Sequence, residues 1–243
     1  MINIDVVNEA TCITLAQLKP IVAAIQAQVH LDFFPAWGRD ANLSLLDSPS
    51  LVNPHHWLMT ILNNSDQAGA LGYHDMTASG LPIGKIFAET DLIYGSSLSV
   101  TISHEVMEML ADPWISLQVP DASRSLIYAY EVADACEDDQ FGYKRENVLL
   151  SDFVYPSYFQ DPPPTPAPRY DQLNHISAPF QVLSGGYMSY MDMTNLAKGW
   201  QQLVTADKLT AGRKQPGSRT ERRRIPPDNR IVSCVRPTLI QVP

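Results

Sequence analysis

The sequence predicts an α/β protein of the α+β kind with a mixed sheet, because strand-like and helix-like segments alternate along its first half. Short apolar segments bounded by turn residues indicate strands at residues 2–7, 57–62, 71–74 and 84–90. Apolar residues at helical spacing indicate helices at residues 14–34 and 99–111. We expect the first helix to back the sheet and the second to underlie a cleft.

The helix predicted over residues 14–34 has a recognisable start. Thr14 is suited to the N-cap, and Gln17 follows three residues later, which is the pattern of a capping box. Pro20 is expected to kink or restart this helix, because it has no backbone N–H. The second helix must end before Pro113, because the residue that precedes a proline disfavours the helical conformation.

The second half of the chain is expected to be less regular. Residues 148–155 have the pattern of a strand, and residues 195–204 that of a short helix or strand. Six prolines fall within residues 156–168, which predicts an exposed extended loop or linker. The stretch FQVLSGGYMSYMDM has the pattern of a hairpin that turns at Gly185-Gly186.

The charge is distributed unevenly and divides the chain into a predicted domain, residues 1–206, and a basic extended C-terminal arm, residues 207–243. The whole chain of 243 residues has a net charge of −9. Residues 1–206 hold 8 basic and 23 acidic residues, whereas residues 207–243 hold 9 basic and 3 acidic residues. This asymmetry predicts that the arm contacts something acidic: a nucleic acid, a neighbouring subunit or the protein's own domain. A solvated tail without a partner explains the composition equally well.

The sequence predicts no membrane span and no secretory signal. It has no run of about 18 apolar residues, and its first residues, MINIDVVNEA, lack a basic region followed by a long apolar one. The three cysteines, Cys12, Cys136 and Cys234, cannot all pair within the chain and form no CxxC motif. We therefore expect a reducing compartment, the cytoplasm.

The most informative stretch is HEVME, residues 104–108, within the second predicted helix. His104 and Glu108 are four residues apart and therefore lie on one helical face, one turn from each other. A zinc hydrolase needs three protein ligands, an open position for water and a base that accepts the proton of that water. His104 and Glu108 are the predicted metal ligands, and Glu105 has the position of the catalytic base.

The third metal ligand must come from elsewhere, and the spacing leaves three candidates. Glu131 follows Glu108 by 23 residues and is favoured. Asp134 is the second candidate; if it does not bind the metal, we expect it to orient His104. Asp112 lies two turns beyond His104 on the same helix and is better suited to a capping or orienting role.

One imidazole and two carboxylates would neutralise a divalent metal ion and weaken it as a Lewis acid. Oxygen-rich ligation also loosens selectivity, so zinc is the expected metal and manganese or calcium are alternatives. Tyr155 or Tyr143 could stabilise an oxyanion, and Tyr155 is the preferred candidate. Cys136 could act as a soft ligand, but a cysteine of this kind is more commonly a core residue.

The other histidines and the nearby acidic run have simpler explanations. His55 and His56 have no partner at a helical or hairpin spacing, so we expect them at the surface. His74 and His175 are isolated, and a core or surface position is expected for each. The acidic run at residues 137–139 lacks the regular ligand spacing of an EF-hand, which favours a solvated loop over a calcium site.

The sequence resembles the zincin metallopeptidases through SHEVMEML followed by YEVADAC, a likeness that covers residues 55–137. It is similar over nearly its whole length to a largely uncharacterised set of bacterial and phage proteins, which share phrases such as NSDQAGALGYHD, SHEVMEMLADP and SDFVYP. The resemblance implies a zincin-like fold with a mixed sheet, a backing helix, an active-site helix, a bound zinc ion and peptidase chemistry. It matches His104 to the first zinc ligand, Glu105 to the base and Glu131 to the downstream ligand. Glu108 departs from the pattern, because it stands where zincins have a second histidine.

Two functional hypotheses follow. The first is a metal-dependent hydrolase, a zinc metallopeptidase that acts on a peptide or protein substrate with Glu105 as general base. The second is a catalytically inactive zincin-like protein of a virion or another assembly, which binds a neighbouring subunit or a nucleic acid through its basic arm. This second hypothesis is motivated by Glu108, the proline-rich loop and the arm. Under it, the protein would be found in a virion as well as in the cytoplasm, and it could form a homo-oligomer.

Overall fold

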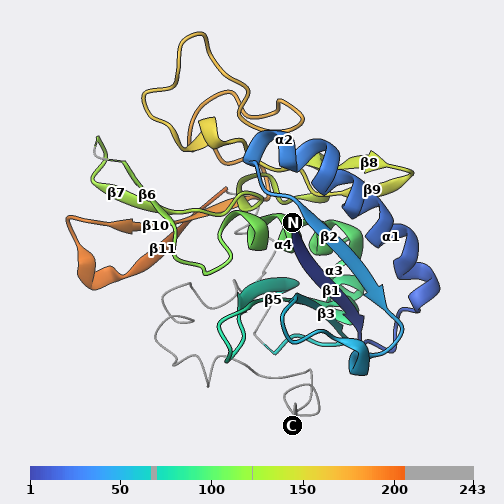
Figure 1. Ribbon diagram of the computed structural model, residues 1–243. Helices are drawn as coiled ribbons and strands as arrows, with labels where there is room; N and C mark the ends of the chain where they lie inside the picture. Colours follow the sequence, from blue (N-terminus) through green and yellow to red (C-terminus); the bar gives the residue numbers. More distant parts are fainter. Residues whose placement is uncertain (67–69, 122, 206–243) are drawn as a thin grey trace.

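The computed structural model describes residues 1–66, 70–121 and 123–205 (Figure 1). The predicted basic arm, residues 207–243, lies outside these ranges, so the expectations about its partners stay predictions. Within the described ranges the chain forms helices and three sheets with both parallel and antiparallel strands. The predicted α/β class is therefore confirmed.

The largest sheet has five strands in the order β2-β1-β3-β5-β4. The strands β1, β2, β3 and β5 are parallel, and β4 pairs with β5 in the antiparallel direction. Strand β4 is therefore the last strand of the sheet on its side. The bounds of the five strands are β1 Ile2–Asn8, β2 Ala41–Leu46, β3 Trp57–Leu62, β4 Gly72–Met76 and β5 Pro82–Phe87.

Helix α1 (Leu15–Gln28) begins at the predicted N-cap. The Thr14 hydroxyl accepts a hydrogen bond from the backbone N–H of Gln17 at 3.3 Å, and the Gln17 side chain accepts one from the backbone N–H of Thr14 at 2.9 Å. Both halves of the predicted capping box are thus present. Pro20 lies inside α1 and does not end it.

The segment predicted as one helix over residues 14–34 is helical but not uniform. After α1 it continues as a π-helical turn, Val29–Phe33, and then as α2 (Phe34–Trp37). Gly38 ends α2 in the left-handed conformation, with φ at 66°. Helix α1 contacts β2 on one side and, on the other, the hairpin formed by β8 (Tyr143–Arg145) and β9 (Val148–Leu150) (Figure 1). No helix in the described ranges is both long and apolar enough to cross a membrane.

The strand predicted over residues 84–90 is too long and needs correction. Strand β5 ends at Phe87, and helix α3 (Ala88–Tyr94) follows at once. The backbone N–H of Glu89 donates to the Asn63 carbonyl at 2.8 Å, so the chain leaves the sheet in helical form.

Helix α4 (Leu98–Ala111) confirms the helix predicted over residues 99–111. Every residue from Val100 to Ala111 is buried. The helix contacts β4 and β5 of the large sheet and also strand β9 (Val148–Leu150) of the hairpin. A helix covered on all sides is normally apolar all round. The ionisable residues of α4 therefore stand in the core, where charge is costly.

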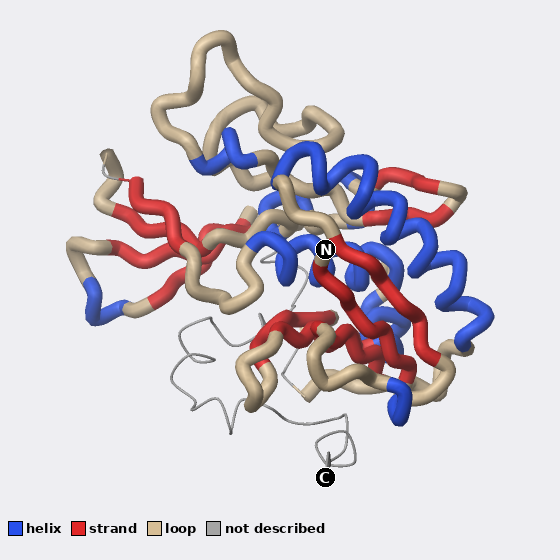
Figure 2. Tube along the Cα trace, viewed as in Figure 1, coloured by secondary structure: helices blue, strands red, loops and turns tan. Residues whose placement is uncertain are grey.

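The remaining strands form a second sheet in the order β11-β10-β7-β6 and the hairpin β8-β9. Figure 2 shows the strands of the second sheet at the left of the view, away from β1 and β2. The strand predicted over residues 148–155 is regular only over β9. The further bounds are β6 Gln118–Asp121, β7 Leu126–Ala129, β8 Tyr143–Arg145, β10 Tyr187–Asp192 and β11 Trp200–Val204.

The predicted hairpin that turns at Gly185-Gly186 is wrong. Strand β10 begins directly after this pair and forms its hairpin with β11 instead. The reason is a tertiary contact: a Cβ at Gly186 would lie 2.5 Å from the Ala135 carbonyl oxygen, so this glycine packs against another segment. Residues 195–204, predicted as a short helix or strand, contain a 3₁₀ turn, Leu196–Lys198, and then β11.

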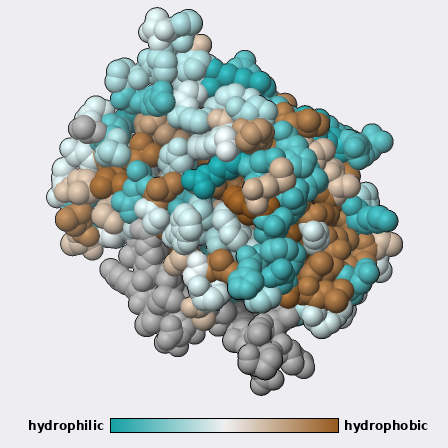
Figure 3. Space-filling view, viewed as in Figure 1, coloured by the Kyte–Doolittle hydropathy of each residue, from teal (hydrophilic) through white to brown (hydrophobic). Residues whose placement is uncertain are grey.

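The proline-rich segment forms an extended loop, as predicted, and residues 160–167 are exposed. It protrudes at the top of Figure 1, where the space-filling view shows a mostly pale or hydrophilic surface (Figure 3). At its base, which we call the neck, residues 152–155 lie antiparallel to residues 170–172, with a β-bridge between Val154 and Asp171. The Trp37 indole donates to the Val154 carbonyl at 2.9 Å and ties the neck to the N-terminal helices.

Candidate metal centre

A first group of residues able to bind a metal consists of His104, Glu108 and Asp134. His104 Nε2 lies 3.3 Å from Glu108 Oε1 and 3.3 Å from Asp134 Oδ1. One donor atom from each of the three residues lies within 4.8 Å of the other two. His104 and Glu108 come from successive turns of α4, whereas Asp134 begins the 3₁₀ turn Asp134–Cys136. Asp134, the second candidate from the sequence, thus stands in this group, and the favoured Glu131 does not.

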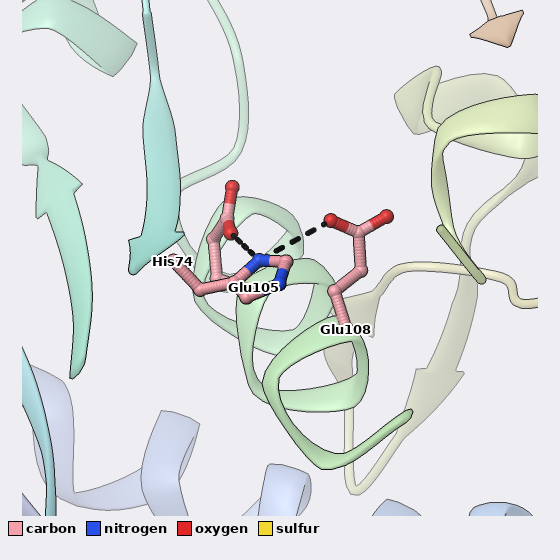
Figure 4. A group of neighbouring side chains, drawn as sticks. All are labelled: His74, Glu105 and Glu108. Carbon is pink, nitrogen blue, oxygen red and sulfur yellow. Dashed lines mark hydrogen bonds and ion pairs between the residues drawn. The ribbon is translucent and has the colours of Figure 1, made fainter. Parts of the chain in front are cut away.

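A second group shares Glu108 with the first. His74, on β4, lies between two glutamates of α4: its Nδ1 is 3.4 Å from Glu105 Oε2 and 3.7 Å from Glu108 Oε2 (Figure 4). Its Nε2 is 4.0 Å from Glu131 Oε2. The two oxygens of Glu108 therefore face different histidines, Oε1 facing His104 and Oε2 facing His74. We call the two groups together the α4 centre.

Gly72 allows β4 and α4 to approach this closely. It lies two residues before His74 and therefore on the same face of the strand. A Cβ at Gly72 would lie 3.0 Å from Glu105 Cγ and 3.1 Å from Thr101 Cγ2. A larger residue would displace the Glu105 side chain, so the position of this carboxylate depends on the glycine.

Burial and crowding control the protonation of the centre. Burial raises the pKa of Glu108 to about 8, with Asp134 adding to the rise and His104 opposing it. Burial by itself lowers the pKa of His104, but Glu108 and Asp134 outweigh this and hold it well above 6.5. The pKa of His74 is also raised, because Glu105 and the other carboxylates outweigh burial. At neutral pH the metal-free centre therefore holds protons that a metal ion would displace.

Histidines are the described partners of three carboxylates of the α4 centre. Among the described residues, Glu105, Glu108 and Asp134 form their ion pairs with His74 and His104. Each buried ion costs several kcal/mol unless it is compensated. A divalent cation would provide this compensation, and carboxylate and imidazole donors are ligands that such ions accept. The residues present therefore fit a metal ion.

The centre lies at the margin of the core. The side chain of His104 is 10% exposed and that of Glu131 is 8% exposed, whereas that of His74 is only 2% exposed.

Asp112, the third ligand candidate from the sequence, caps the chain after α4. Its Oδ1 and Oδ2 accept hydrogen bonds from the backbone N–H groups of Ser116 and Leu117, each at 2.9 Å. It belongs to none of the metal-binding groups found among the described side chains, because its oxygens serve the turn that follows the helix. Cys136 is buried and is also outside these groups, as expected of a core residue.

The tyrosine next to the centre is not the one preferred from the sequence. The Tyr155 hydroxyl donates to Gln172 Oε1 at 2.8 Å, at the neck of the loop. Tyr187 follows Gly186, the residue that packs against the backbone at Asp134. Burial, with the charge of Asp134 and its neighbours, raises the pKa of Tyr187 well above 10. This phenol therefore stays protonated at neutral pH.

His74 is the residue that the sequence did not connect with the site. A core position was one of the two positions expected for His74, but its contacts with Glu105, Glu108 and Glu131 were not predicted. Neither its spacing from His104 nor its local pattern indicates a contact, because the contact arises from the packing of β4 against α4. Only the alternation along β4, which puts His74 on the face of Gly72, gave a weak signal.

Comparisons with known proteins do not identify the chain. No protein-family model, no curated protein and no solved structure matches it. The likeness to zincins therefore stays a prediction, and a function has to be inferred from the geometry of the centre.

Proposed function

We propose that this chain is a metal-dependent hydrolase, a zinc metallopeptidase, whose metal ion is held by His104, Glu108 and Asp134. The observation that carries the proposal is the meeting of one imidazole nitrogen and two carboxylate oxygens within 4.8 Å of one another, in the core of the molecule. Three protein ligands leave a coordination position open, as in catalytic rather than structural zinc sites. A fourth ionisable group, Glu105, lies beside the set on the same helix.

A zinc ion bound there would polarise a carbonyl group and lower the pKa of a bound water. Two carboxylate ligands donate more negative charge than two histidines and so weaken both effects. This donor set also suits manganese, which is the main alternative to zinc.

Glu105 is the proposed general base. Its Oε2 lies 3.4 Å from His74 Nδ1, and this carboxylate is one of the groups that raise the pKa of His74. The pair holds the Glu105 carboxylate in one position, so His74 acts as a positioning residue. Glu105 would take the proton of the attacking water and later deliver it to the leaving amine.

The resemblance of SHEVMEML and YEVADAC to the zincin metallopeptidases supports a peptide or protein as the substrate.

The variant Glu105→Gln tests the proposal. It should lower hydrolysis of a protein or mixed-peptide substrate by about 10²- to 10⁴-fold, while mass spectrometry finds the same metal content as in the wild type. The matched control is Glu146→Gln, an exposed glutamate in the turn between β8 and β9, which should leave hydrolysis unchanged.

Two results would reject the proposal. One is equal hydrolysis by the two variants. The other is protein purified without chelator that contains no stoichiometric metal. If the wild type binds metal but never hydrolyses a peptide, the inactive assembly protein remains as the alternative, and the arm on which it depends lies outside the described residues.

A further inference from the structure

The neck of the proline-rich loop contains another group of metal-binding side chains, which the proposed function does not use. Asp152 and Asp171 face each other across the neck, one on each side of the loop, and His175 follows four residues after the second aspartate. Asp152 Oδ2 lies 3.6 Å from His175 Nδ1, and Asp171 Oδ2 lies 3.8 Å from the same nitrogen. The three donor atoms are all within 4.8 Å of one another.

Both aspartates are fixed by backbone hydrogen bonds that aim them into this group. Asp152 Oδ1 accepts from the N–H of Phe153 at 2.7 Å and of Gln172 at 3.1 Å. Asp171 accepts from the backbone N–H of His175 at 2.8 Å, and its other oxygen accepts from Ile176. The geometry is therefore built by the backbone of the neck and does not depend on flexible side chains.

One oxygen in this group has no hydrogen-bond donor. Asp152 Oδ2 is buried and accepts no hydrogen bond from any side chain or backbone group that the structure describes, and the Asp152 side chain is 0% exposed. Burial, with the charge of Asp171, raises the pKa of Asp152 to about 8. A buried carboxylate oxygen without a donor is costly, and it points toward a second carboxylate and an imidazole.

We propose that Asp152, Asp171 and His175 bind a divalent transition-metal ion that fastens the neck of the loop. Two carboxylate oxygens and an imidazole nitrogen suit zinc or manganese, whereas calcium requires six to eight oxygen ligands. The His175 side chain is 39% exposed, so water can complete the coordination. This ion has a structural role, and the inference does not rest on the proposed function.

The neck is in direct contact with the segment that carries the α4 centre's outer residues. The backbone N–H of Val154 donates to the Val132 carbonyl at 2.7 Å. Val132 is the neighbour of Glu131 and lies two residues before Asp134. An ion that holds residues 152–155 in place would therefore also hold the segment that supplies a ligand to the centre.

The variant His175→Gln tests this inference in the full chain. The exposed imidazole can be replaced without opening the core, and His55→Gln, at an exposed position, is the matched control. After dialysis against zinc alone or manganese alone, mass spectrometry should find one equivalent fewer in His175→Gln than in the wild type or the control. Limited proteolysis should then cut the 160–167 loop faster in His175→Gln than in the control.

The outcomes separate this ion from that of the α4 centre. If His175→Gln binds as much metal as the wild type, the neck ion is rejected, whatever His104→Ala does. If His104→Ala loses no metal but His175→Gln loses one equivalent, the neck ion stands and the proposed function fails.

Asp152→Asn gives a second measurement. If the two aspartates merely share a proton, Asp152→Asn should melt at a higher temperature than the wild type. In that case zinc should not raise the melting temperature of the His104→Ala protein. That result would overturn the inference. If zinc raises the melting temperature of His104→Ala by several degrees but not that of His104→Ala/Asp152→Asn, the neck ion is supported.

Discussion

The first group of the α4 centre (His104, Glu108 and Asp134) and the neck offer a metal ion the same donors, one imidazole and two carboxylates, but hold them differently. At the neck, backbone N–H groups donate to both aspartates; the donors are Phe153, Gln172, His175 and Ile176. In the α4 centre, the main-chain donor to the first group is Ala133, which donates to Glu108 Oε1 at 3.2 Å. The other partners of Glu108 and Asp134 are ionisable side chains.

This difference separates a structural from a reactive arrangement. Backbone amides fix a carboxylate and neutralise part of its charge, so the neck can hold an ion but has little freedom to move protons. In the α4 centre, carboxylates and histidines share protons among themselves, and a metal ion or a substrate can displace these. The same donor set thus suits a structural metal ion at the neck and a catalytic metal ion at the α4 centre.

The largest effect on hydrolysis is expected from His104→Ala, which tests whether the α4 centre is the reactive one of the two sites. The variant should bring hydrolysis to background and remove the metal of the α4 centre, because the imidazole of the proposed ligand set of His104, Glu108 and Asp134 is lost. The metal at the neck should stay. Metal content and hydrolysis measured on the same preparation check this, with His55→Ala as the control at an exposed position. Hydrolysis retained without the imidazole would show that the reactive site lies elsewhere.

A smaller effect is expected from Tyr187→Phe, which sharpens the account of the α4 centre. Loss of one hydrogen bond to a developing oxyanion should lower kcat by about 10²-fold, without loss of metal, because the phenol is not a ligand. Tyr155→Phe is the matched control: its hydroxyl is bonded to Gln172 at the neck, so kcat should not change. Steady-state kinetics that gave the reverse order would restore Tyr155 to the proposed role.

The smallest effect is a pH dependence. In the metal-free protein the pKa of Glu108 is raised to about 8 and that of His104 well above 6.5. Below pH 8 a zinc ion must therefore displace at least one proton, so its affinity should rise at least about tenfold per pH unit from pH 6 to 8. Competition with a chromophoric chelator in the His175→Gln background measures this centre alone. An affinity that is flat over this range would show that the ligands are already deprotonated.

The fold was predictable where the signals are local. The capping box at Thr14 and the apolar spacing of α4 needed only neighbouring residues, and both are correct. Residues 41–45 alternate between apolar and polar side chains, so β2 also has a local signal in the sequence. The hairpin at Gly185-Gly186 failed for a different reason, because the glycine pair serves a contact with Ala135 that lies 51 positions away from Gly186.

The candidate site was predictable only in its helical part. The spacing of His104, Glu105 and Glu108 places these residues together on any helix. The choice between Glu131 and Asp134 depends on a 3₁₀ turn that follows an irregular stretch, and neither helical nor strand periodicity describes it. His74 comes from β4, whose packing against α4 has no local signature, and Tyr187 comes from β10, which contacts the 3₁₀ turn Asp134–Cys136.

Val154 connects parts of the chain that are made at different times. Its carbonyl accepts a hydrogen bond from the Trp37 indole, and its N–H donates to the Val132 carbonyl. The segment with Glu131 and Asp134 is therefore held in place by a residue that follows it in sequence. A nascent chain that has emerged only as far as Asp134 already carries every ligand of the proposed metal, yet it lacks the residue that holds the last ligand in position. We therefore expect metal capture during synthesis to begin only after Val154 has left the ribosome.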